Sequence, residues 1–285
     1  MIDETQDLLT LVSLTLVDYS ISYWKHIVKK LSDTDMKTER MKLEMHTNIL
    51  KNSIELGQEA ARYSADIIND AIDKNGKARI ILSTGASQFD TLKALIKEDI
   101  DWEKVEMFHL DEYINLPVSH PASFRKYLKE RFIDKTNIKD YHLVNGEGDI
   151  KEIIEKLTIE LRREPIDLGL IGIGQNAHIA FNDPPADFGT EEAYIVVNLN
   201  DTCKRQQVSE GWFASIDDVP DQAISMTVYQ IMQCKHIVSC VPSKAKAKAI
   251  SDMFKNPVTN QVPATMLKMH QDVELFLDSD SASLL

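Results

Sequence analysis

The 285-residue sequence is poor in cysteine, with only Cys203, Cys234 and Cys240, and these three show no CxxC spacing. This count excludes a disulfide framework and a cysteine-based zinc site, and it is typical of small buried side chains in a reducing compartment. Ten glycines and nine prolines are too few for a collagen-like or low-complexity chain.

Long hydrophobic runs are also missing. The most apolar early stretch, residues 8–17, is too short to span a bilayer and is followed at once by Asp18. The first residues include Asp3 and Glu4 instead of the basic region that opens a signal peptide. We therefore expect a cytoplasmic protein with no membrane partner.

Positive charge is the third deficit. Lysine and arginine total 32 against 45 acidic residues, which gives a formal net charge of −13. Such a surface repels phosphate backbones and excludes nucleic acid as a partner. A small anion is still compatible, because it needs only a local pocket of backbone N–H groups and one or two cations.

The chain divides into a short and a long part. Apolar residues recur at spacings of three to four over residues 3–31, which predicts a helix, and the polar residues 32–40 follow it. We expect residues 1–40 to form an N-terminal helical extension and residues 41–285 to form one domain. The helix could pack on its own domain or on a second copy, so a homo-oligomer is one alternative.

From residue 41 onward, apolar strands alternate with amphipathic helices. This alternation predicts an α/β fold, a mostly parallel sheet with helices on both faces (Rossmann-like). Ligands of such sheets lie beyond the carboxyl ends of the strands. The expected helices are 49–73, 86–96, 123–132 and 150–163, and the expected strands are 78–82, 105–110, 166–173, 193–199, 236–241 and 273–277.

Small residues follow the strand at 78–82, where the sequence reads Thr84, Gly85, Ala86, Ser87 and Gln88. A loop of this kind lets backbone N–H groups approach a phosphate at the start of a helix. It matches neither a P-loop nor GxGxxG, so an ordinary capped strand–helix turn is an equal alternative.

Asp111 follows the strand at 105–110, and a carboxylate at that position is well placed to act as a general base. Acidic residues at loop starts more often cap a helix or pair with lysine. His109 and Asp111 could share a metal, but no HxxxH or HExxH pattern supports a metal site.

The segment 172–184 carries Gly174, Asn176, His178 and Asp183 directly after an apolar strand. A lone histidine is usually structural. Here Asn176 and Asp183 could fix the tautomer of His178 and let it shuttle protons. There is no GxSxG elbow, so acyl chemistry of the Ser-His-Asp type is not supported.

Two basic clusters could bind an anion. Lys244 follows the strand at 236–241 and so lies near the predicted ligand edge, while Lys204 and Arg205 have a less certain position. The alternative is a solvated basic face that keeps an acidic protein soluble.

Taken together, these segments resemble the glucosamine-6-phosphate deaminase/isomerase family, which shares its fold with 6-phosphogluconolactonases. The resemblance covers residues 41–285. The continuation NAHIAFNDP and the triplet DEY resemble the deaminase branch more than the lactonases. The motifs that carry it are STG at 83–85, LDEY at 110–113, HPASFR at 120–125, GIGQNAHIAFNDP at 172–184 and SK at 243–244.

The resemblance implies an amino-sugar 6-phosphate as substrate and no metal or redox cofactor. It implies that His178 assists ring opening, that Asp111 moves a proton between C2 and C1, and that ammonia then leaves C2. The loop at 84–88 and Lys244 are expected to hold the phosphate, with Gly174 beside the sugar.

Three departures from the family motif bear on specificity. The family typically has Asp at the position of Asn176 and Glu at that of Asp183, and an Arg after the Thr where this chain has Cys203. Lys204 or Arg205 could take over recognition of the phosphate or sugar, and galactosamine 6-phosphate or a related epimer could be the substrate. A 6-phosphogluconolactonase-type hydrolase and a non-catalytic sugar-phosphate sensor on the same fold are the alternative functions.

Overall fold

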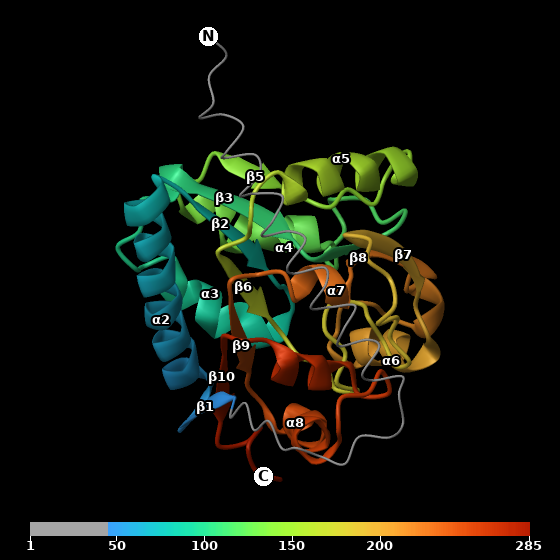
Figure 1. Cartoon of the computed structure of the whole chain (residues 1–285). Coiled ribbons are helices and arrows are strands. Elements are labelled where there is room, and N and C mark those ends of the chain that lie inside the picture. The colour runs from blue at the N-terminus through green and yellow to red at the C-terminus, as the bar shows by residue number, and fades with distance from the viewer. Residues whose placement is uncertain (1–44) are drawn as a thin grey trace. The chain divides into compact units, whose positions relative to one another are not determined.

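The structure is a computed structural model and describes residues 45–285 (Figure 1). The helix expected at 3–31 and the polar segment 32–40 lie outside the described residues. Among residues 45–285, no helix is both long enough and apolar enough to cross a bilayer.

A seven-stranded, fully parallel sheet forms the centre of the domain, in the order β1-β10-β9-β6-β2-β3-β5. The predicted mostly parallel sheet is confirmed. All seven carboxyl ends therefore point to one edge. The strands are β1 (His46–Leu50), β2 (Ala78–Leu82), β3 (Val105–His109), β5 (Asp140–His142), β6 (Leu168–Ile171), β9 (His236–Val241) and β10 (Val273–Asp278).

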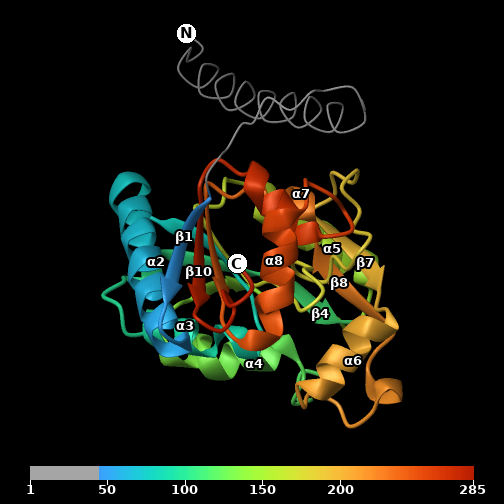
Figure 2. The ribbon, with the colours of Figure 1, turned by 90° about the horizontal axis from the view of Figure 1, so that it is seen from below.

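Helices cover both faces of this sheet, as predicted. Figure 2 shows α2 and α8 on opposite sides of β1 and β10. The helices are α2 (Ser53–Asn75), α3 (Phe89–Leu95), α4 (Phe124–Arg131), α5 (Ile150–Arg162), α6 (Asp201–Ser209), α7 (Val228–Ile231) and α8 (Ala247–Lys255).

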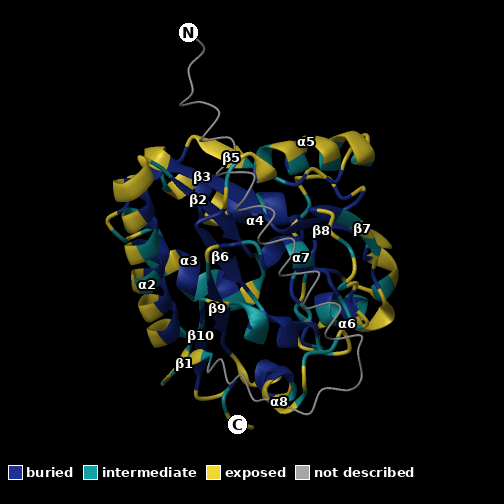
Figure 3. Ribbon diagram, in the orientation of Figure 1, coloured by how far each residue is buried: buried dark blue, intermediate teal, exposed yellow. Residues whose placement is uncertain are grey.

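Helix α2 shows how local sequence sets the packing. Its N-cap Asn52 accepts hydrogen bonds from the backbone of residues 54 and 55, and Gly76 ends it in the left-handed conformation at φ 78°. The buried stripe of α2 packs on the main sheet, and Figure 3 shows exposed residues on its outer side. Its expected start at residue 49 was wrong, because His46–Leu50 pairs with β10 as an edge strand.

A second, antiparallel sheet was not predicted. It contains β4 (Asp111–Tyr113), β8 (Gln222–Met226) and β7 (Tyr194–Asn198), in the order β4-β8-β7. The chain leaves β3 after His109, and the Leu110 carbonyl accepts a hydrogen bond from Met226 N at 2.8 Å. Asp111 is therefore both the residue beyond the end of β3 and the first residue of this small sheet.

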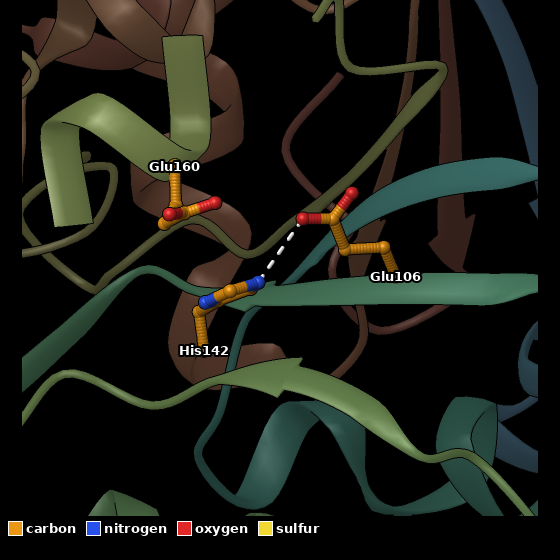
Figure 4. Close-up of side chains that lie close together, drawn as sticks. All are labelled: Glu106, His142 and Glu160. Carbon is orange, nitrogen blue, oxygen red and sulfur yellow. Dashed lines mark hydrogen bonds and ion pairs between the residues drawn. The ribbon is translucent and has the colours of Figure 1, made fainter. Parts of the chain in front are cut away.

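A buried ion-pair network joins β3 to the end of α5. The carboxylate of Glu106 accepts from Arg79 Nε at 2.7 Å and from Arg163 at 2.9 Å, and it contacts His142 at 3.0 Å. Glu106, His142 and Glu160 lie together in Figure 4. Burial alone would raise the pKa of Glu106, but the guanidinium groups lower it. Because two guanidinium groups already neutralise the carboxylate, we interpret the cluster as structural.

Glu106→Gln should lower the free energy of unfolding by about 3 to 5 kcal/mol, because it leaves the buried guanidinium of Arg79 without a charged partner. The matched control is Glu164→Gln, which removes an exposed pair with Lys77 and should cost at most about 1 kcal/mol. Urea unfolding of both variants measures the difference. Equal small losses would show that the network contributes little to stability.

Candidate active site

A cleft of about 490 Å³ opens at the carboxyl edge of the main sheet. The register places Leu82 of β2 beside His109 of β3, and Leu50 of β1 beside Asp278 of β10, so the strands end together. Residues that follow β1, β2, β3, β6, β9 and β10 line this cleft. The sequence prediction of a site at this edge matches the position of the cleft.

The loop after β2 forms one wall of the cleft, through Thr84, Gly85, Ala86 and Ser87. Gly85 has φ 96°, which favours glycine, and its carbonyl accepts from Tyr127 Oη at 3.0 Å. Gln88 does not line the cleft. It is 1% exposed and donates to the Cys240 carbonyl at 3.1 Å, so its expected contact with substrate is wrong and its role is to tie the loop to β9.

Asp111 also lines the cleft and is 7% exposed. Burial, together with the adjacent charge of Glu112, raises the pKa of Asp111 to about 8. A carboxyl group with a pKa near neutrality can both accept and return a proton under ordinary conditions. The structure thus gives Asp111 the properties that a general base requires.

Glu112 has no exposed surface and is fully hydrogen-bonded. One oxygen accepts from the backbone N–H groups of Tyr113 and Phe124, and the other accepts from Ser123 Oγ, Arg125 N and Arg125 Nε. These contacts explain the spacing between LDEY and HPASFR in the sequence. They hold the start of α4 against β4, directly beside Asp111.

The loop after β6 carries His178 into the cleft. Its imidazole lies against Gly174, where an added Cβ would come within 2.2 Å of His178 Nε2. Ala177 and Ala180 adopt left-handed conformations at φ 64° and 49°, which turn the chain tightly around the ring. Gly174 is therefore needed to make room for His178, in addition to lining the cleft.

Asp183 orients His178. Its Oδ1 lies 2.9 Å from His178 Nδ1 and accepts from Asn176 Nδ2 at 2.9 Å. Burial opposes ionisation of Asp183, but its hydrogen bonds with His178 and with the amide of Asn176 keep its pKa below the usual value. An ionised Asp183 assigns the proton to His178 Nδ1 and leaves Nε2 as an acceptor. Asn176 does not line the cleft and acts through Asp183.

His109 takes no part in a ligand site with Asp111. Its ring is fully buried and packs edge-on against Phe124, with 6.4 Å between ring centroids. Burial, reinforced by the charge of Arg125, lowers the pKa of His109 to about 3, so the ring is neutral.

Of the lysines and arginines in residues 45–285, Lys246 lines the cleft, whereas Lys244, which the sequence favoured, does not. Both residues belong to the short 3-10 turn after β9, and side chains two positions apart in such a turn point in directions about 120° apart. Lys246 is 8% exposed and lines the cleft, whereas Lys244 faces solvent. Burial lowers the pKa of Lys246, and the nearby carboxylate of Glu210 opposes that shift.

Lys204 and Arg205 also face away from the cleft, contrary to expectation. Lys204 pairs with Asp221 at 2.5 Å, and Arg205 pairs with Asp201 at 3.2 Å. The opposite face of α6 and its C-cap supply Gln206, Gln207 and Glu210 to the cleft. The buried Cys203 shares that face at helical spacing, and this periodicity was the signal that sequence reasoning missed.

A family model described as glucosamine-6-phosphate isomerases/6-phosphogluconolactonase matches residues 51–276. The chain belongs to this family. Glucosamine-6-phosphate deaminase of Lactobacillus delbrueckii subsp. bulgaricus is 35% identical over 240 residues, which cover 83% of this chain and 98% of that protein. The enzyme of the same name from Oenococcus oeni is 34% identical over 246 residues, covering 86% and 99%.

Two solved structures have a similar fold. A monomeric glucosamine-6-phosphate deaminase has a TM-score of 0.77 and 29% identity, and the match covers 85% of this chain and all of that one. The 6-phosphogluconolactonase of Trypanosoma brucei has a TM-score of 0.71 with 14% identity, covering 85% and 99%. This second likeness shows the shared fold alone.

In this member of the family, Lys246→Met should weaken binding of inorganic phosphate about 10- to 150-fold, the range for loss of a charge-assisted hydrogen bond. Methionine keeps most of the buried volume. Lys244→Met is the matched control two residues away and should change the affinity less than about twofold, as an exposed charge does. Calorimetric titration of inorganic phosphate into each variant measures the two affinities. Equal effects of the two substitutions would contradict the assignment of Lys246 as the cation that binds phosphate.

Proposed function

We propose that the chain catalyses isomerisation of an amino-sugar 6-phosphate to a ketose 6-phosphate with release of ammonia. The observation that carries this proposal is the presence of Asp111 and His178 in one cleft, with Asp183 hydrogen-bonded to His178 and with Lys246 and the small loop after β2 in the same lining. Relatives named glucosamine-6-phosphate deaminase support the same reaction. Glucosamine 6-phosphate or an epimer such as galactosamine 6-phosphate is the substrate.

Ring opening is the first step and falls to His178. Its Nε2 is the free acceptor, because Asp183 holds the proton on Nδ1. Nε2 takes the proton of the anomeric hydroxyl and returns it to the ring oxygen as the C1–O5 bond breaks, which gives the open-chain aldehyde. Asn176 fixes Asp183 for this step through its 2.9 Å hydrogen bond.

Proton transfer between carbons is the second step and falls to Asp111. As a carboxylate it removes the proton from C2, and the electron pair forms a C1=C2 double bond while the C1 carbonyl oxygen takes a proton from solvent. Asp111 then returns its proton to C1, and the lone pair of the C2 amine forms the C2=N bond. The resulting iminium at C2 adds water and releases ammonia, which leaves the ketose phosphate. A carboxylate with a pKa raised to about 8 is a stronger base toward the C2 proton than an ordinary carboxylate, and its conjugate acid can still give that proton to C1.

The phosphate is assigned to the end of the cleft near Lys246. Thr84–Ser87 lie in the same cleft, and their small side chains allow backbone N–H groups to come close to an anion. The phosphate thereby anchors the substrate at a fixed distance from the reacting carbons. The cytoplasmic location and the homo-oligomer expected from the sequence remain predictions.

A substrate panel tests the function. The protein is incubated with glucosamine, galactosamine and mannosamine 6-phosphates and, separately, with 6-phosphogluconolactone. Release of ammonia from one hexosamine phosphate is the expected result. Hydrolysis of the lactone alone would replace the proposal with a lactonase, and binding of a hexosamine phosphate without turnover would replace it with a sensor.

Asp111→Asn should reduce kcat about 10²- to 10⁴-fold, as loss of a positioned base does. The variant should bind the sugar phosphate as the parent does and should be no less stable, because a neutral amide replaces a carboxyl whose ionised form is destabilised by burial. Ammonia release, phosphate titration and thermal unfolding provide the three readouts. Turnover within about threefold of the parent would show that the base lies elsewhere.

A further inference from the structure

The ends of β9 and β10 are joined by the carboxylate of Asp278. Both of its oxygens accept from the backbone N–H of Ser243, at 3.1 and 3.0 Å, and Oδ1 also accepts from Ser281 N at 2.8 Å. Asp278 is 5% exposed and lines the cleft. Its hydrogen bonds therefore connect one wall of the cleft to the turn that follows β9.

Ser243 has an unusual backbone conformation, with φ 90° and ψ 140°. A non-glycine residue at such a φ is strained and persists only where its surroundings hold it. The Ser243 N–H is held by the two hydrogen bonds that it donates to the carboxylate of Asp278. Ser243 is also the residue on which the next turn is built, because its carbonyl accepts from Lys246 N at 3.0 Å.

The position of Lys246 thus depends on the conformation of Ser243. A different φ at Ser243 would turn the 3-10 segment Lys244–Lys246 and remove Lys246 from the cleft. This dependence also accounts for an acidic side chain in a cleft that accepts an anion. By charge alone, Asp278 would repel a phosphate and weaken its binding.

We infer that Asp278 is a positioning residue that holds Ser243 in its strained conformation at positive φ and so presents Lys246 to the phosphate group of the substrate. The inference rests on the proposed function for the identity of the substrate. The effect of Asp278 on anion binding through Ser243 does not depend on turnover and can be measured without it. If Asp278 acted only through its charge, removing that charge would strengthen phosphate binding. If it positions Ser243, the same change weakens phosphate binding, so the two roles can be distinguished.

The test compares Asp278→Asn with Asp280→Asn. Both remove one negative charge from the lining of the same cleft, but only Asp278 contacts Ser243. Asp278→Asn should raise KM for the sugar phosphate and the dissociation constant of inorganic phosphate about tenfold, with kcat within about threefold of the parent. The reason is that an asparagine side chain has only one oxygen that can accept from the Ser243 N–H, where the carboxylate has two. Asp280→Asn should lower both constants slightly, by about twofold or less, as removal of a screened surface charge does.

A second substitution tests the route through Ser243. Glycine adopts positive φ without strain, so Ser243→Gly added to Asp278→Asn should restore most of the lost affinity. Failure of this rescue, or tighter phosphate binding in Asp278→Asn, would overturn the inference. Asp278→Glu keeps the charge but displaces the carboxylate, so it should also weaken phosphate binding. This variant keeps the test available if Asp278→Asn fails to fold. Unchanged phosphate binding in Asp278→Glu would contradict the positioning role of Asp278.

The failure of the proposed function would be seen separately. If the parent protein releases no ammonia from any hexosamine phosphate, the proposed function is wrong, and the titrations with inorganic phosphate still decide the role of Asp278. If the parent is active and Asp278→Asn keeps its KM, the function stands and the positioning role is wrong.

Discussion

The burial of the Glu112 carboxylate is the constraint on which the rest of the site depends. A fully buried carboxylate is tolerated only when its oxygens are hydrogen-bonded and its charge is compensated, and here Arg125 and the first turn of α4 do both. These contacts hold β4 against the start of α4. They also keep a negative charge beside Asp111, which adds to burial in raising the pKa of Asp111.

Two carboxyl groups thus have opposite tendencies to ionise: Asp111, which lines the cleft, and Asp183, which is hydrogen-bonded to His178. Asp183 is held in its ionised form by His178 and Asn176, whereas Asp111 lacks such donors among the described residues and is pushed toward its neutral form. Divergent environments of this kind are how one active site assigns different proton-transfer roles to similar groups. The ionised acid orients a histidine, and the acid with the raised pKa exchanges protons with carbon.

Much of the scaffold could be predicted from the sequence because it depends on local patterns. The apolar runs at 78–82 and 236–241 have the bounds of β2 and β9, and their ends locate the cleft. The small antiparallel sheet could not be found in this way, since the three residues of β4 are held by contacts with distant segments. His46–Leu50 was missed for the same reason, because pairing with β10 overrides its helical spacing.

The site was predicted less completely than the fold, and the errors concern orientation. Asp111 and His178 lie on the segments that follow the buried strands β3 and β6, so strand direction fixes the edge of the sheet at which they lie. Lys244 and Lys246 cannot be distinguished by spacing alone, since the turn that separates them depends on Ser243 and thus on Asp278, 35 residues away. The basic pair on α6 was chosen for its charge, although the periodicity around Cys203 placed the opposite face of the helix in the cleft.

The pH dependence of kcat/KM for the amino-sugar phosphate tests the central claim most directly, with the amine pKa of the substrate measured separately. If Asp111 is the base, kcat/KM should rise with pH through an apparent pKa of about 8, and fall about tenfold for each pH unit below it. A profile that is flat between about pH 6 and pH 9, or that follows only the amine of the substrate, would contradict the account.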